Sequence, residues 1–134
     1  MRVENRKLTA AQKIQQLLKL ENESLLVEGE EAVAFLNGQA FVVDALAPQT
    51  EFAVLPRNGG QYTFPKWWDT QFVIIRNLDA VPIKDQEKFI QLAENHSVSG
   101  VSIPNTTHII FTITKGNAKL VSRRVYENLV HVTE

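Results

Sequence analysis

An unbroken apolar run, Phe-Val-Ile-Ile at residues 72–75, constrains the fold more than any other feature of the sequence. A β-strand whose successive side chains are all apolar has no face to turn toward water, so it must be covered on both faces. We predict a central strand at residues 72–78 and a second one at 108–114, where three apolar residues also follow one another. Further strands are predicted at residues 24–28, 40–44 and 125–132.

Helical patterns separate most of these strands. Thr9 can cap a first helix, because Gln12 is placed to reach back to it. A short helix is predicted over residues 30–36, and Asp85 is predicted to cap a third helix over residues 85–94. Strands that alternate with helices favour an α/β fold of three layers, with a mainly parallel sheet and helices on both faces.

We expect one α/β domain over residues 1–134, with an N-terminal helix within 1–23 and the sheet core in 24–134. The net charge is −1, so the chain as a whole does not attract nucleic acid or an acidic membrane. It has no cysteine, which excludes disulfides, thiolate metal sites and a cysteine nucleophile. The sequence shows no membrane-length apolar run and no apolar signal segment, so a cytoplasmic location is expected.

Residues 72–114 run in the order strand, turn, amphipathic helix and strand, with Leu78-Asp79 and Pro82 in the turn. This order resembles the core of the AAA+ ATPases, from their magnesium-binding acidic strand to the strand that senses the γ-phosphate. The resemblance implies a P-loop NTPase-like core. In that family the acidic strand usually ends in Asp-Glu, whereas here Arg76 and Asn77 occupy the two positions. Arginine cannot hold Mg²⁺, and asparagine cannot take a proton from water.

A phosphate-binding P-loop, Gly-x-x-x-x-Gly-Lys-Ser/Thr, is absent from the sequence. The resemblance would place it between residues 27 and 35, where Gly29 stands among Glu28, Glu30 and Glu31. Acids at the start of a helix favour its dipole, but here they would also repel phosphates. We therefore expect no ATP hydrolysis, no catalytic residue, no bound cofactor and no metal. We also expect no helical lid after the core.

Ser122-Arg123-Arg124 resembles the Ser-Arg-Cys element of AAA+ clamp-loader subunits, with Arg124 in the place of the cysteine. In those subunits the arginine reaches into a neighbour's nucleotide site. A guanidinium suits that role because its planar fork can bind phosphate oxygens in two places. The alternative is a solvated pair of arginines before an edge strand.

Trp67 and Trp68 end an irregular segment, residues 45–68, that also carries Arg57 and Lys66. The first interpretation is that the aromatic rings close the core under a long loop. The second is a protein interface, which an exposed tryptophan beside a cation would suit. The third is stacking on single-stranded bases.

We favour a non-catalytic protein-interaction module that resembles an inactive AAA+ subunit, as a subunit or regulator in a DNA-replication-type or other ATPase assembly. Its partner would be an active ATPase subunit or a second copy of the chain, with no direct contact to nucleic acid or membrane. The predicted partner-binding residues are Arg123, Arg124, Trp67 and Trp68.

Two other functions remain open. One is a nucleic-acid-binding domain that uses the aromatic and basic segment. The other is a small enzyme whose site lies at the carboxyl ends of the strands. Asp79 lies in a turn and is expected to cap the segment that follows it. No two of the three histidines have ligand spacing on one helix. The enzyme's polar set would be Asp44, Asn77, Asp79, Thr114 and Lys115.

Overall fold

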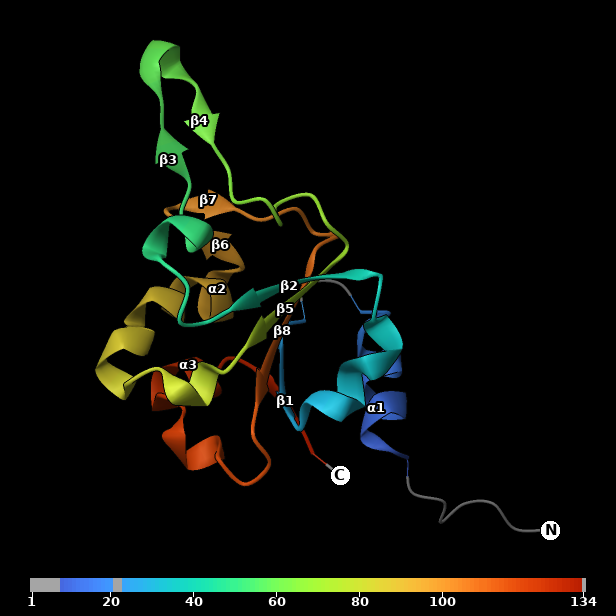
Figure 1. The fold of residues 1–134 in the computed structure, drawn as a ribbon. Coiled ribbons are helices and arrows are strands. Elements are labelled where there is room, and N and C mark those ends of the chain that lie inside the picture. The colour runs from blue at the N-terminus through green and yellow to red at the C-terminus, as the bar shows by residue number, and fades with distance from the viewer. Residues whose placement is uncertain (1–7, 21–22, 134) are drawn as a thin grey trace, which may run out of the picture.

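A five-stranded parallel sheet forms the centre of the protein (Figure 1). The computed structural model describes residues 8–20 and 23–133, so the predicted N-terminal segment at 1–7 lies outside the described residues. The strand order is β2-β5-β8-β1-β9, which places β2 and β9 at the two edges. The strands are β1 (Leu25–Glu28), β2 (Ala40–Asp44), β5 (Phe72–Arg76), β8 (His108–Ile113) and β9 (Val130–Val132).

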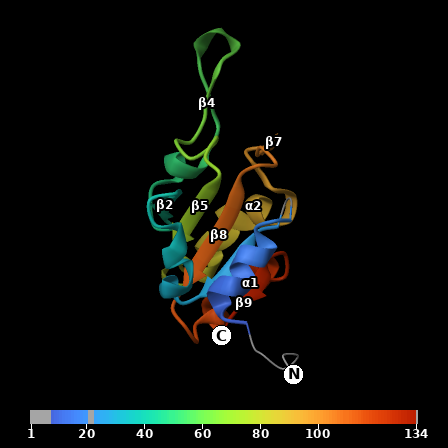
Figure 2. The same ribbon diagram turned by 90° about the vertical axis from the view of Figure 1, so that its right-hand side faces the viewer.

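Helices cover both faces of the sheet, as Figures 1 and 2 show. On one face lie α1 (Ala10–Leu17) and the 3₁₀ helix η1 (Glu30–Leu36). The other face is covered by η5 (Ile83–Phe89), α2 (Ile90–Asn95) and α3 (Arg123–Tyr126). The three-layer α/β fold predicted from the sequence is therefore confirmed. The remaining short elements are η2 (Gln49–Phe52), β3 (Leu55–Pro56), η3 (Asn58–Gly60), β4 (Tyr62–Thr63), η4 (Leu78–Ala80), β6 (Ser97–Val98), β7 (Val101–Ser102) and η6 (Ala118–Leu120).

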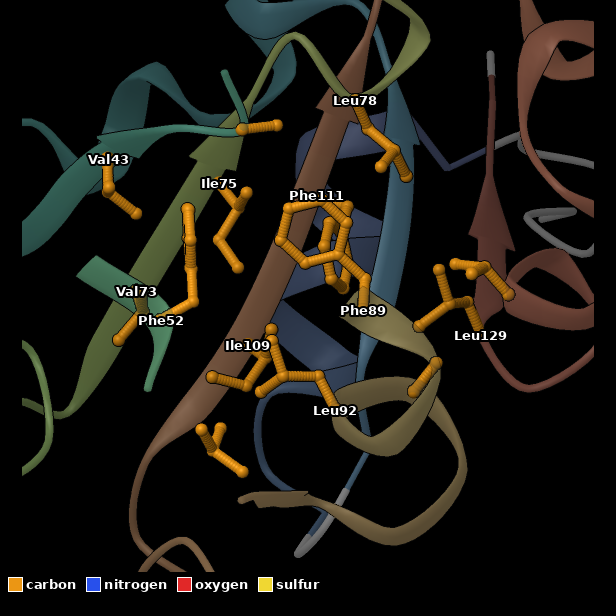
Figure 3. Close-up of a cluster of buried hydrophobic side chains, with 14 of the residues drawn as sticks. Val43, Phe52, Val73, Ile75, Leu78, Phe89, Leu92, Ile109, Phe111 and Leu129 are labelled. Atoms are coloured by element: carbon orange, nitrogen blue, oxygen red, sulfur yellow. The ribbon is translucent and has the colours of Figure 1, made fainter. Parts of the chain in front are cut away.

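The central strands feed two separate hydrophobic clusters because their side chains alternate between the faces. Ile74 and Ile110 pack with α1 and η1, while Ile75 and Phe111 face the opposite layer. In that opposite cluster, shown in Figure 3, the Phe89 ring meets the Phe111 ring edge-on with their centroids 5.5 Å apart. Edge-to-face packing of this kind adds to the free energy gained by burying the rings.

The first helix begins as predicted. The Thr9 hydroxyl accepts a hydrogen bond from the Gln12 amide at 3.1 Å, and the Gln12 side-chain oxygen accepts one from the Thr9 amide at 2.9 Å. This reciprocal pair satisfies two backbone donors that the first turn leaves without partners. Ala10 and Ile14 are completely buried against the sheet.

Two sequence predictions need correction. The strand predicted at residues 125–132 is shorter, because α3 occupies 123–126 and only Val130–Val132 pairs with β1. Asp85 does not cap a helix, since its helical segment begins earlier, at Ile83, after Pro82. The fixed backbone angle of proline suits the position before a helical turn, so the local start signal came from Pro82.

Gln86 holds the helical segment that begins at Ile83 in its place. Its side chain is fully buried, and its amide nitrogen donates to the carbonyl oxygens of Val81 and Leu120, both at 2.9 Å. Its side-chain oxygen accepts from the Ser122 amide at 2.6 Å. One polar side chain thus joins the connections around β5 and β8 to the start of α3, and it satisfies buried backbone groups that have no strand partner.

Both tryptophans belong to the core. Trp67 is 0% exposed and Trp68 8% exposed, and the Trp67 indole N–H donates to the Glu51 carbonyl at 2.9 Å. They lie in a turn, where the Trp68 amide bonds to the Pro65 carbonyl, so both rings point inward with their centroids 5.9 Å apart. The core-packing interpretation is therefore the one that the structure supports. The partner-binding role predicted for Trp67 and Trp68 lacks the exposed ring that it needs.

No helix within residues 8–20 and 23–133 has the length and apolar character needed to cross a membrane.

Replacing Gln86 with Leu should lower the free energy of unfolding by about 3 kcal/mol, because similar volume is kept while buried carbonyls and an amide lose their partner. Urea unfolding of the variant measures the loss. Gln15→Leu, on the exposed side of α1, is the control and should change stability by less than about 0.5 kcal/mol. Equal stability of Gln86→Leu and the wild type would show that the network contributes little.

Candidate functional site

The polar side chains that could bind a ligand or take part in a reaction lie where the parallel strands end. In open α/β sheets, ligands bind in the crevice beyond the carboxyl ends of the strands. Here β1 ends at Glu28 and β5 ends at Arg76, while Thr114 and Lys115 follow β8. The element order found by sequence analysis thus brings distant residues to one edge of the sheet.

An ion pair occupies this edge between the ends of β1 and β5. Arg76 binds Glu30 with both arms of its guanidinium, Nε to Oε1 at 2.5 Å and Nη2 to Oε2 at 3.0 Å. Both side chains are about half exposed, at 46% and 45%. The hydrogen bonds that Arg76 donates to Glu30 raise the pKa of Arg76, so the guanidinium keeps its charge at every physiological pH.

The turn before η1 is occupied by acidic side chains, Glu30 in its ion pair with Arg76 and Glu31 over Gly29. Gly29 adopts φ +98°, a backbone angle that a side chain would strain. The Glu31 carboxylate folds back over Gly29, because an added Cβ there would lie 2.9 Å from its Oε1. Two of the three acids predicted to repel phosphates therefore lie at the turn, with Glu30 bound to Arg76 and Glu31 folded across the backbone.

A shallow cleft of about 350 Å³ opens beside the ion pair. At its base the Thr112 hydroxyl is fully buried and has no hydrogen-bond partner among residues 8–20 and 23–133. Lys115 is the second cation on the rim. No group of three metal-binding side chains comes together anywhere in the described part of the chain.

The polar set of the enzyme alternative separates into two hydrogen-bonded groups. In one, the Asn77 side-chain amide donates to the Asp44 carboxylate at 2.8 Å. In the other, Asp79 accepts from the Thr114 amide at 3.1 Å and from the Asn117 side chain at 2.8 Å. Asp79 thus holds the loop after β8, and the prediction that it caps the segment following its turn is wrong. The β8 loop approaches closely enough to provide better donors.

A third hydrogen-bonded group, Glu28–His131–Tyr126, was not predicted from the sequence. His131 Nε2 contacts the Glu28 carboxylate, and His131 Nδ1 lies 2.9 Å from the Tyr126 hydroxyl. Glu28 also accepts from the Gly116 amide at 2.7 Å, the largest of the causes that lower its pKa. Glu28 and His131 are 103 positions apart in the chain, so only the pairing of β1 with β9 brings them together.

The predicted arginines are on the surface of α3. Arg124 binds Glu94 of α2 at 2.7 and 3.1 Å, while Arg123 binds Glu127 at 2.7 Å on its own helix. The Arg123 side chain is 91% exposed and that of Arg124 is 64% exposed. With both tryptophans in the core, the four predicted partner-binding residues do not form one surface patch.

Comparison with known proteins gives similarity of fold only. No protein-family model and no curated protein sequence matches this chain. Among solved structures, NtrX from Brucella abortus superposes with a TM-score of 0.54 at 13% identity, over 96% of this chain and 37% of that one. A DNA polymerase III gamma subunit-related protein from Thermotoga maritima MSB8 superposes with a TM-score of 0.53 at 12% identity, over 92% of this chain and 45% of that one.

The chain has a three-layer α/β fold that is similar to the fold of both solved structures. It spans less than half the length of either solved structure. The predicted resemblance is thus supported only as a similarity of fold, and identity this low says nothing about activity.

The lowered pKa of Glu28 predicts a pH-dependent contribution to stability. The ionised carboxylate is favoured in the folded state, so its contribution is present above the ordinary pKa of 4.5 and is lost as pH falls through the lower folded value. In urea unfolding, Glu28→Gln should be less stable than the wild type at neutral pH, and the difference should shrink in acid. A difference that is independent of pH would contradict this assignment.

Proposed function

We propose that this domain is a non-catalytic protein-interaction module that resembles an inactive AAA+ subunit. The observation that carries the proposal is the Arg76–Glu30 ion pair at the carboxyl edge of the sheet. Arg76 stands where the resemblance expects a magnesium-binding acid, and Glu30 stands where it expects a phosphate-binding loop. The pair satisfies both groups without a nucleotide or a metal.

A nucleotide would have to displace this pair. If a phosphate took Arg76, Glu30 would lose its partner and remain beside the phosphate together with Glu31. Two like charges about 4 Å apart repel by about 4 kcal/mol at the effective dielectric of a protein surface. Lys115 is a single cation on the rim and cannot neutralise two acids and a polyphosphate. The arrangement therefore opposes phosphate binding, and we assign the domain no cofactor, metal or hydrolytic step.

The partner in this proposal is a protein: an active ATPase subunit or another copy of the domain. The similarity in fold to a DNA polymerase III gamma subunit-related protein supports a role in a DNA-replication-type or other ATPase assembly. Arg123 is the best candidate for contact, because its side chain is almost wholly exposed and its only described ion pair is within one helix. Such a pair holds an arginine weakly, so it can be exchanged for a partner's carboxylate or phosphate.

A thermal-shift titration with ATP and ADP, with and without Mg²⁺, tests the proposal. A ligand that binds only the folded state must raise the melting temperature by mass action, so we expect no shift at millimolar nucleotide. The control is Arg76→Ala. A shift in the wild type that disappears in this variant would place nucleotide at the edge of the sheet and overturn the proposal. A shift that persists in it would overturn the proposal equally, with the nucleotide bound elsewhere.

Arg123→Glu should leave the melting temperature unchanged, because an exposed pair contributes about 0.5 kcal/mol or less. It should reduce capture of the ATPase partner by the tagged domain from cells, compared with the wild type. Lys19→Glu, an exposed residue just after α1, makes the same change in charge and is the control. Equal capture by all three proteins would remove Arg123 from the contact surface.

A further inference from the structure

A two-stranded hairpin projects from the body of the protein (Figures 1 and 2). It consists of β3 and β4, with Leu55 paired to Thr63 and Pro56 paired to Tyr62. The Arg57 amide donates to the Gln61 carbonyl at 2.7 Å and closes the hairpin around its tip. Gly59 and Gly60 turn the chain there with φ of +83° and +78°, angles that favour glycine over other residues.

The hairpin exposes apolar and basic side chains together. Tyr62 is 57% exposed, Phe64 43% and Leu55 39%. The Phe64 ring lies 5.0 Å from the buried Trp68 ring and so anchors the root of the hairpin to the core. Arg57 and Lys66 are its only charged residues, because no acid occurs between Glu51 and Asp69. An exposed Tyr and Arg on a projecting element are typical of the residues that dominate protein interfaces.

A groove with the opposite character lies beside η1 and the edge strand β2. It has a volume of about 320 Å³, and Val33, Ala34 and Val42 line its apolar part. Val42 is 50% exposed, although it belongs to the sheet. Glu30 and Glu31 lie at the same groove. Glu30 is held by Arg76, whereas Glu31 forms no ion pair with any residue in the described ranges 8–20 and 23–133.

We propose that the hairpin of one copy docks into this groove of a second copy. Tyr62 fills the apolar part against Val42, and Arg57 lies beside Glu31. The two surfaces are complementary. The aromatic ring of Tyr62 matches the apolar part of the groove, and the cation Arg57 matches the acid Glu31. A groove of this volume accommodates a single aromatic side chain, which is how a projecting anchor residue usually binds.

The contact is between two different surfaces of the chain. The hairpin points away from the body in both views, so its tip cannot reach the groove of its own copy (Figures 1 and 2). Contacts of this head-to-tail kind either close into a ring or continue as an open chain. This inference rests on the proposed function in that both treat the domain as a protein-binding module, and it specifies the partner as a second copy. One small anchor and one charge pair form a weak interface, with a Kd of roughly 10 µM to 1 mM.

Sedimentation of the full chain over a range of concentrations tests the proposal. The average mass of the wild type should rise with concentration. Tyr62→Ser, on the hairpin, and Val42→Ser, in the groove, should each weaken association about tenfold or more. Ile83→Ser is the matched control, because Ile83 is an apolar residue 53% exposed outside both surfaces, and it should associate as the wild type does. The melting temperatures of all three variants confirm that they are folded.

Charge reversal identifies the pairing. Arg57→Glu and Glu31→Arg should each reduce self-association, and a mixture of the two should associate, because the reversed hairpin of one then meets the reversed groove of the other. A mixture that stays monomeric while the wild type associates would overturn the Arg57–Glu31 contact.

Two further results would overturn the docking itself. One is a wild type that stays monomeric up to about 1 mM, where even the weakest expected Kd would leave a large share of the protein associated. The other is association that neither Tyr62→Ser nor Val42→Ser affects. In the monomeric case, fluorescence anisotropy with a labelled oligo-dT strand shows whether the hairpin binds single strands instead. None of these results depends on ATP, so they are independent of the nucleotide test of the proposed function.

Discussion

The pairing of β5 with β8 is the constraint on which the rest of the structure depends. Both strands are buried on both faces, so the chain must supply a helical layer on each side. Short connections must therefore lead the chain from the sheet to each helical layer. Those connections are built mostly from 3₁₀ turns and need polar groups to satisfy their backbone. Gln86 does this inside the fold, where no water can replace it.

The same topology decides where the chemistry lies. Parallel strands place all their carboxyl ends at one edge, and in related folds this edge holds nucleotide. In this chain the edge is filled by contacts within the protein: Arg76 with Glu30, Asn77 with Asp44, and Asp79 with the loop after β8. Arg76, Glu30, Asn77, Asp44 and Asp79 already have partners there of opposite charge or hydrogen-bonding character. The polar residues at this edge therefore stabilise the sheet through contacts within the protein.

Three surfaces are left for other molecules, and one of them, the groove beside β2, borders this edge at Glu30 and Arg76. The α3 arginines, the projecting hairpin and the groove beside β2 are on different parts of the molecule, which suits a domain with more than one neighbour. The hairpin is inserted between β2 and β5, so it adds a contact surface without disturbing the strand order. Its aromatic root on Trp68 explains why the two tryptophans are in the core: they hold the base of an element that extends into solvent.

The sequence by itself determined the alternation of strands and helices, the doubly buried central strands, the capped first helix and the identity of Arg76 and Asn77 at the end of β5. These are local properties of spacing and residue type, which hydrophobic periodicity and side-chain chemistry report directly. Only the tertiary structure decided that Arg76 would pair with Glu30, that His131 would meet Glu28, that Gln86 would be buried, and that adjacent tryptophans would both face inward. Those contacts join residues far apart in the chain or depend on a turn in place of a strand, and pairwise partners of that kind exist only once the sheet has set its register.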